Sequence, residues 1–334
     1  MEYDTVTFKW KIPMNKATLM LDSLYKIVDG ESISNQDALK LAGRLNHYFP
    51  LIPGGRWERF WVGRLGDGEV HRARMMRPCS LARSQAAWWI ANLQLGLGWN
   101  RIPELERRSP HNFVGLYPDA AGGSDMKPHL GLGGCIMEGA EIPWVYLPWP
   151  LLVRENRSNE DGEKFASKLS VLEAVAALAL MSSEPALLKG RAVRIFTDNK
   201  GFYYSYNKGY SSDPYLMTVV MALSAMARAL DINLWVRWTP RRSGLGERVA
   251  DDLSKADFRA ARENIPRLSK EPSDISRTLI SWIENPIQSR VLGQAMVEEC
   301  SRITPVLRWN LENSDEVQVL TKYRKRKANW QLMK

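Results

Sequence analysis

The segment VRIFTDN (residues 193–199) joins a short apolar run to an acidic residue. Its β-branched and aromatic side chains predict a strand over residues 193–197. Asp198 closes that strand, and Asn199 follows it. Because apolar neighbours fix an acid at the end of a core strand, Asp198 is a candidate metal ligand; the other interpretation is an ordinary turn residue.

The elements around this segment predict one α/β domain. Upstream lie three short apolar runs and then an apolar helix over about 168–181; downstream lie an apolar helix over about 215–230, a strand over 234–238 and a helix over about 247–261. The three upstream runs cover residues 113–117, 130–137 and 144–146. They read as a meander of strands, so the whole order predicts a mixed five-stranded sheet flanked by helices.

Two further regions flank this domain. Apolar residues recur at helical spacing from residue 14 onward, which predicts a mainly helical region over 1–110. The α/β domain is expected over 111–260, and residues 261–334 are expected to form a helical, basic extension. Five of the six residues from Lys322 to Lys327 are basic. Such a run is typical of a solvated tail, and a nucleic-acid contact or a nuclear localisation signal are the alternatives.

The distribution of charge favours an anionic partner. The 334 residues carry a net charge of +9. Residues 1–110 hold 16 Lys and Arg against 11 Asp and Glu, and residues 259–334 hold 14 against 9, whereas residues 111–258 are balanced at 16 against 17. Basic flanks around a near-neutral middle suit a nuclease whose acidic site is surrounded by phosphate-binding regions. A merely soluble basic surface is an equally open interpretation.

Cysteine and histidine usage points to an intracellular protein without zinc. Cys79, Cys135 and Cys300 lie far apart and form no paired framework, which is typical of reduced thiols. The four histidines show no metal-ligand spacing. No apolar run approaches the roughly 18 residues of a membrane span. We therefore expect a nuclear or cytoplasmic protein that does not bind membranes.

Four acidic residues are candidate catalytic and metal-binding groups: Asp119, Glu173, Asp198 and Asp251. Phosphodiester hydrolysis requires an activated water and neutralised charge, which two ions held by carboxylates can supply. Hard oxygen ligands favour Mg²⁺ or Mn²⁺. Glu173 is the most informative, because an acid on an otherwise apolar helix is costly unless it is paired or bound to metal.

Each acid also has a structural interpretation. Asp119 and Asp198 are acceptable turn residues, and Glu173 is acceptable on a solvent-facing helix edge. Asp252 competes with Asp251, since either acid suits the first turns of a helix.

Five segments in order resemble the ribonuclease H domain of retroelement reverse transcriptases, with most similarity to the DIRS-like elements. They are LYPDAAGG (116–123), LGLGG (130–134), LSVLEAVAAL (169–178), RIFTDNKG (194–201) and VRWTP with VADDLSKAD (236–240 and 249–257). The preceding IPMNKATLMLDSL (12–24) and LAGRLNHYFPLIPGGRWERFWVGRL (41–65) are similar to the thumb and connection region of those proteins. The resemblance covers about residues 10–258.

The resemblance implies a ribonuclease H-like fold and a nuclease that cuts the RNA strand of RNA–DNA hybrids. It implies that Asp119, Glu173 and Asp198 hold two Mg²⁺ or Mn²⁺ ions and that Asp251 completes the second site. The polymerase portion of a reverse transcriptase would be a partner. Residues expected to contact nucleic acid are Arg56, Arg59, Arg64, Asn199, Arg241 and Arg242.

Two departures from that family stand out. Many ribonuclease H domains carry a histidine in the loop before the last acid, whereas residues 240–246 here read PRRSGLG, with Arg242 near that place. Arginine can hold a phosphate but does not exchange protons near neutral pH. No Tyr-x-Asp-Asp polymerase motif occurs. We therefore expect a chain that does not polymerise DNA and that derives from a polyprotein, a separate reading frame or a truncated copy.

The rival interpretation is a catalytically inactive module that binds nucleic acid or a partner. Arg56, Arg59 and Arg64 alternate with Trp57 and Trp61, a pattern that suits phosphate contacts and base stacking. The two tryptophans, spaced four residues apart, also suit one buried helix face. A third interpretation, an integrase or junction resolvase on the same fold, conflicts with the thumb-like segment ahead of the domain.

Overall fold

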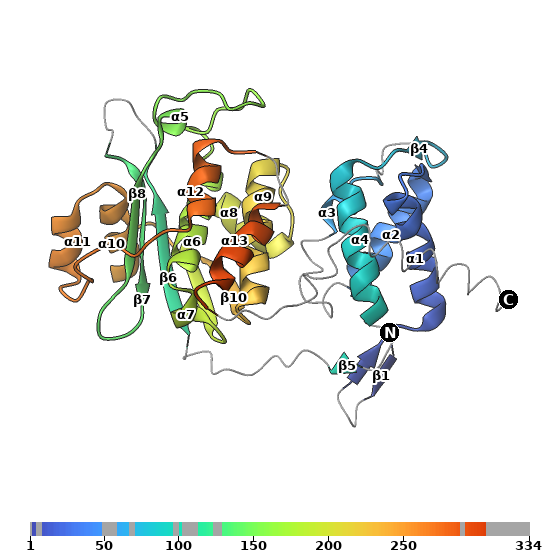
Figure 1. The fold of residues 1–334 in the computed structure, drawn as a ribbon, viewed down its shortest axis with the longest axis horizontal. Coiled ribbons are helices and arrows are strands. Elements are labelled where there is room, and N and C mark those ends of the chain that lie inside the picture. Colours follow the sequence, from blue (N-terminus) through green and yellow to red (C-terminus); the bar gives the residue numbers. More distant parts are fainter. Residues whose placement is uncertain are drawn as a thin grey trace. The chain divides into compact units, whose positions relative to one another are not determined.

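A computed structural model describes residues 2–4, 9–48, 59–66, 71–95, 100–101, 113–122, 129–287 and 291–304 (Figure 1). These residues form two units, one within the first 101 residues and one from residue 113 to residue 304. The predictions for Arg56, Trp57 and the basic run from Lys322 to Lys327 lie outside the described residues.

The described part of the first unit is mainly helical. Its helices are α1 (Met14–Val28), α2 (Asn35–Tyr48), α3 (Phe60–Gly63) and α4 (Ser80–Leu95). Small sheets accompany them, one formed by β1 (Glu2–Asp4), β2 (Lys9–Lys11) and β5 (Asn100–Arg101), the other by β3 (Ile33–Ser34) and β4 (Met75–Met76). Met20, Leu41 and Trp89 are among the fully buried core residues. Trp61 is partly buried and packs against this core, whereas Trp57 lies outside the described residues, so the shared helix face of the two tryptophans stays a prediction.

A mixed five-stranded sheet forms the centre of the second unit. Its strands are β6 (Val114–Ala120), β7 (Gly131–Met137), β8 (Trp144–Pro148), β9 (Ala192–Thr197) and β10 (Asn233–Trp238). They lie in the order β10-β9-β6-β7-β8. The meander β6-β7-β8 is antiparallel, whereas β9 runs parallel to β6 and β10 parallel to β9. The expected mixed α/β sheet flanked by helices is thus confirmed.

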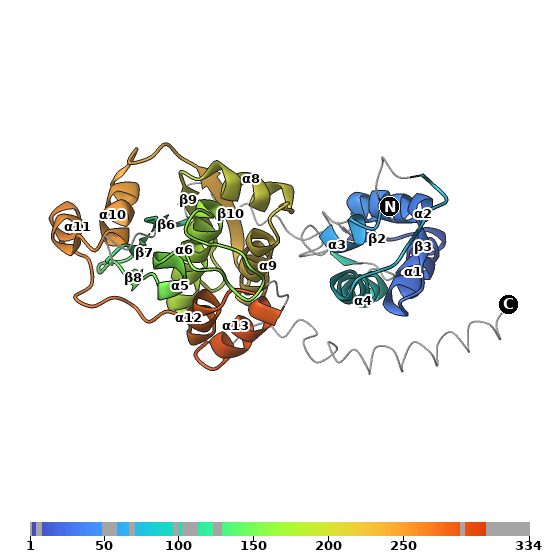
Figure 2. The same ribbon diagram turned by 90° about the horizontal axis from the view of Figure 1, so that it is seen from above.

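Helices cover both faces of this sheet. They are α5 (Leu151–Arg154), α6 (Leu169–Ser183), α7 (Pro185–Leu188), α8 (Lys200–Lys208), α9 (Pro214–Ala229), α10 (Leu245–Ser254), α11 (Phe258–Asn264), α12 (Arg277–Glu284) and α13 (Val291–Ser301). Successive residues of a strand face opposite sides of a sheet. A Cβ on Gly133 would meet the backbone of Ser254 in α10, and one on Gly134 would meet Leu180 in α6. Therefore α6 and α10 cover opposite faces (Figure 2).

The helix α6 is apolar all round because it is buried on two sides. One side packs on β6 and β7, and the other packs against α9. Every residue from Val171 to Met181 is buried, including Glu173. A helix with no polar face is typical of the interior of a layered domain. Glu173 is consequently enclosed by the fold.

The helix expected over 247–261 is interrupted, and this expectation was wrong. It divides into α10 and α11 because Ala256 adopts a left-handed backbone with φ of 58°. Asp257 then caps α11 by accepting a hydrogen bond from the amide of Ala260. The short helix α8 was not expected from the sequence. It begins where the Asn199 side chain accepts a hydrogen bond from the amide of Phe202.

Residues 261–304 pack on the second unit. Helix α13 lies against α9, where a Cβ on Gly293 would come within 3.0 Å of Ala222 and Ala225. Leu268 forms an isolated bridge with Ile142, next to β8. The helices of the expected C-terminal extension therefore share the core of the α/β domain as far as residue 304. In the described residues, no helix combines the length and apolarity needed to cross a membrane.

Candidate metal centre

Parallel pairing of β6 and β9 brings the first two candidate acids together. The carboxyl ends of parallel strands lie at the same edge of a sheet. The register that pairs Val114 with Val193 and Leu116 with Ile195 aligns Asp119 with Asp198 when it is continued. Asp119 lies inside β6, which extends to Ala120 beyond the predicted end at Tyr117, because pairing with β7 continues there.

Glu173 is the third member of the cluster. It lies on the sheet-facing part of α6, two turns or less from the start of the helix at Leu169. Carboxylate oxygens of Asp119, Glu173 and Asp198 all lie within 4.8 Å of one another. Asp119 and Glu173 are buried, and Asp198 is half-buried. Three of the four acids chosen from the sequence therefore converge: Asp119 from β6, Glu173 from α6 and Asp198 from the residue after β9.

This cluster is electrostatically costly in the absence of a cation. One oxygen of Glu173, Oε2, is buried without a hydrogen-bond partner. Burial raises the pKa of Glu173 well above its usual value, and the charges of Asp119 and Asp198 act in the same direction. Burial also raises the pKa of Asp119 to about 6, with the hydrogen bond from Ser254 opposing this shift. A bound cation would remove much of this cost.

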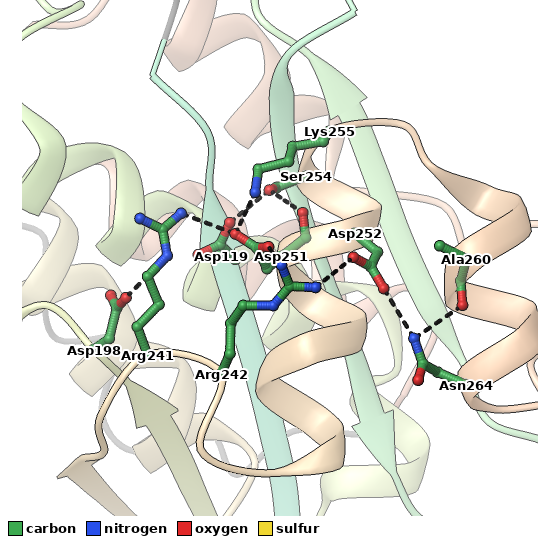
Figure 3. Close-up of polar contacts among 10 residues, drawn as sticks. All are labelled: Asp119, Asp198, Arg241, Arg242, Asp251, Asp252, Ser254, Lys255, Ala260 and Asn264. Carbon is green, nitrogen blue, oxygen red and sulfur yellow. Dashed lines mark hydrogen bonds and ion pairs between the residues drawn. The ribbon is translucent and has the colours of Figure 1, made fainter.

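The fourth predicted acid, Asp251, is not part of that cluster. It is buried in α10, with 2% of its surface exposed. Its Oδ1 accepts hydrogen bonds from Arg241 Nη2 at 2.9 Å and from Lys255 Nζ at 2.7 Å (Figure 3). Arg242 Nη1 lies 3.4 Å from its Oδ2. Burial alone would raise the pKa of Asp251, but the hydrogen bonds from Lys255 and Arg241 outweigh burial and lower it.

The neighbouring Asp252 has a separate environment. It pairs with Arg242 at 3.3 Å and accepts a hydrogen bond from Asn264 of α11 at 3.1 Å. Helix α10 thus directs Asp251 toward the acidic cluster and Asp252 toward α11 (Figure 3). Of the two acids that the sequence left in competition, Asp251 is the one whose charge affects Asp119.

Ser254 and Lys255 are two site residues that sequence reasoning missed. Ser254 Oγ donates a hydrogen bond to Asp119 Oδ2 at 2.5 Å and also lies 3.0 Å from the carbonyl oxygen of Asp251. Lys255 lies one helical turn after Asp251. Their positions at three and four residues after Asp251, on the same helix face, were the available signal.

A groove of about 1170 Å³ opens beside the acidic cluster. Asp119, Glu173 and Asp198 all line it. Its described wall is otherwise rich in polar and cationic groups, including His129, Lys168, Ser170, Asn199, Lys200, Ser211, Arg241 and Lys255. Such a wall, with acids at one place and cations around them, can hold an anionic polymer next to a bound metal.

Only some of the residues predicted to contact nucleic acid lie at the groove. Asn199 and Arg241 line the groove, and Asn199 also caps α8. Arg242 is engaged by Asp251 and Asp252. Arg59 and Arg64 belong to the first unit, where Arg59 donates a hydrogen bond to Asn46 and Arg64 is exposed. Arg56 lies outside the described residues.

Comparison of the chain with protein-family models, with curated proteins and with solved structures found no match. The site must therefore be interpreted from its own geometry.

Proposed function

We propose that the second unit is a metal-dependent nuclease of the ribonuclease H type that hydrolyses the RNA strand of RNA–DNA hybrids. The observation that carries the proposal is the convergence of Asp119, Glu173 and Asp198 at a groove, with a buried carboxylate oxygen of Glu173 lacking a partner. Asp119 lies in β6, Glu173 lies in α6 and Asp198 directly follows β9, and the three appear in the chain order that the family resemblance implies. A mixed five-stranded sheet flanked by helices also agrees with that resemblance.

The donor set suits a hard divalent cation. All three ligands are carboxylates, and oxygen ligands favour Mg²⁺ or Mn²⁺ over softer metals. The orphaned Glu173 oxygen is the kind of atom that a cation would satisfy. A divalent ion at this position would supply stabilisation of negative charge on a phosphodiester during hydrolysis.

The protein's own groups would hold the substrate and orient the acids. Lys168, Lys200, Arg241 and Lys255 line the groove and suit the phosphates of a nucleic-acid strand. Ser254 fixes the Asp119 carboxylate through its hydroxyl hydrogen bond. The choice of an RNA–DNA hybrid rests on the sequence resemblance, and it implies a reverse-transcriptase polymerase as the partner that makes such hybrids.

The test is cleavage of a labelled RNA–DNA hybrid by the full chain with Mg²⁺ or Mn²⁺. We expect wild-type protein to cut the RNA strand. We expect the cleavage activity of Asp198→Asn to fall by at least about 10- to 100-fold, the loss typical of a disturbed metal site. Asp231→Asn makes the same chemical change at an exposed residue outside the groove lining, and asparagine also tolerates the left-handed backbone found there. It should cleave like wild type.

Two results would count against the proposal. Equal cleavage by wild type and Asp198→Asn would remove Asp198 from the site. Hybrid binding by wild type without metal-dependent cleavage would support the inactive binding module instead.

A further inference from the structure

We propose that Asp251 is a positioning residue that holds Arg241 and Lys255 as a phosphate-binding pair, and that it is not a metal ligand. This inference deepens the proposed nuclease function and rests on it for the identity of the phosphate. It replaces the expectation that Asp251 completes a second metal site with a different chemical role for this residue.

The contacts of Asp251 are those of an anchor. Its side chain is 2% exposed, whereas the side chains of Arg241 and Lys255 are 63% and 42% exposed. Both cations bond to the same atom, Oδ1, at 2.9 Å and 2.7 Å. A buried carboxylate that binds two exposed cations fixes one end of each contact while leaving the rest of each side chain toward solvent. The anchor is therefore inside the protein, and the cations are at its surface.

These residues differ in whether they line the groove. Arg241 and Lys255 line it, whereas the described lining includes neither Asp251 nor Arg242. A ligand in the groove thus meets positive charge where the sequence had predicted a fourth carboxylate. Arg241 also reaches toward the acidic cluster, with its Nε 3.9 Å from Asp198 Oδ2 (Figure 3).

The other oxygen of Asp251 also faces a cation. Oδ2 is buried and makes no hydrogen bond, and its nearest described cation is Arg242 Nη1 at 3.4 Å. Cationic groups of the protein thus already face both oxygens of Asp251, two at Oδ1 and one at Oδ2. A second divalent cation would have to displace them, whereas a phosphodiester in the groove would be attracted to Arg241 and Lys255. Arginine suits this role because its planar group can bind two phosphate oxygens together.

A titration of the full chain with Mn²⁺ tests the first half of the proposal. We expect one ion per chain for wild type, and the same number and affinity for Asp251→Asn. Asp198→Asn should lose the ion. Two ions for wild type, with one lost in Asp251→Asn, would overturn the proposal and restore Asp251 as a ligand. This count needs no cleavage, so it remains decisive if the proposed nuclease activity fails.

Binding of an RNA–DNA hybrid in EDTA, measured by fluorescence anisotropy over a range of salt concentrations, tests the second half. The slope of log affinity against log salt should fall by about 1 in Arg241→Ala and in Lys255→Ala, because each loses one phosphate contact. Arg248→Ala is the matched control, since it removes an exposed cation of α10 that is not among the groove-lining residues, and its slope should stay unchanged. Equal slopes in all four proteins would overturn the assignment.

Kinetics then separate positioning from a merely structural role. If wild type cleaves the hybrid, Asp251→Asn should raise KM more than it lowers kcat, while its thermal melting shows a folded protein. A fall in kcat accompanied by weaker Mn²⁺ binding would instead identify a metal ligand. Absence of cleavage by wild type would reject the nuclease proposal alone, because the ion count and the salt slopes still decide the role of Asp251.

Discussion

Glu173 is a carboxylic acid enclosed by an apolar helix and a sheet, and its ionised form is stable there only with help. Burial and the charges of Asp119 and Asp198 raise its pKa well above the usual value. Burial and the charges of Asp251 and Asp198 likewise raise the pKa of Asp119. A raised pKa in the folded state means that the native protein binds more protons than the unfolded chain over the interval between the two pKa values. Stability then falls as pH rises through that interval.

This fall in stability with rising pH predicts how the effect of a metal ion on stability depends on pH. For Asp119 the interval runs from about 4 in the unfolded chain to about 6 in the folded protein. The metal-free protein should lose stability as pH rises through that interval. Mn²⁺ should therefore raise the Tm more at pH 7.5 than at pH 5, where protons compete for the same oxygens. Thermal melting with and without Mn²⁺ measures this, and a gain in Tm that does not change with pH would contradict it.

Glu173→Gln should remove both the destabilisation caused by the buried charge and the binding of the metal ion. The neutral amide occupies the same place without a buried charge, so we expect the metal-free protein at pH 7.5 to gain about 1–3 kcal/mol in free energy of unfolding. The Mn²⁺-dependent rise in Tm should disappear. Urea unfolding followed by circular dichroism measures the first effect. A less stable variant that still responds to Mn²⁺ would show that Glu173 is an ordinary buried acid and not a ligand.

At the scale of elements, the approach of α10 to β7 places Ser254 beside Asp119. The approach is close because Gly133 has no side chain: a Cβ there would lie 2.3 Å from the backbone nitrogen of Ser254 and 2.5 Å from the carbonyl carbon of Leu253. Backbone atoms cannot move aside as a flexible side chain can. The position of α10, and with it the hydrogen bond from Ser254 to Asp119, depends on this glycine.

Gly133→Ala should therefore destabilise the second unit by about 2–4 kcal/mol, since one extra methyl group must displace a helix. Gly122→Ala is the matched control, because a Cβ there meets only Leu169 Cδ2, at 3.9 Å. Denaturant midpoints of the two variants measure the difference. Similar midpoints would mean that α10 does not pack on β7 as closely as the structure has it.

At the scale of the whole molecule, the last described helices belong to the core of the second unit. Helix α12 buries Leu279, Trp282 and Ile283, and α13 buries Leu292, Met296 and Val297. Asn159, in the segment between α5 and α6, donates hydrogen bonds to the hydroxyl of Tyr215 and to the carbonyl of Pro286. Residues more than a hundred positions apart thus close one domain.

A chain that ends at residue 274 should lose several kcal/mol of stability, because each large apolar side chain removed from the core contributes about 1.5–3 kcal/mol. A chain that ends at residue 304 keeps α12 and α13, and its second unit should unfold at a higher urea concentration than that of the chain that ends at residue 274. Limited proteolysis and urea unfolding compare the two. Equal stability of the two chains would mean that residues 275–304 are an appended extension that does not stabilise the core.

Much of the fold could be predicted because its signals are local. Alternating or continuous apolar runs identified all five strands of the sheet, and the apolar stretch around Glu173 identified α6. The helix α8 was missed because its start depends on a cap from Asn199. The break between α10 and α11 was missed because it depends on the left-handed backbone conformation of Ala256, which the residue type does not predict.

The sequence by itself determined which chemical groups are present and in what order: three acids on core elements, cations beside them, and an apolar framework that fixes their backbone. Only the tertiary structure decided which of those groups meet. Parallel register aligned Asp119 with Asp198, and the enclosure of α6 brought Glu173 to them. Asp251 was instead matched with Arg241 and Lys255. Local propensity sets where helices and strands form, but the partner of a charge depends on distances between elements, and those are fixed only when the elements pack.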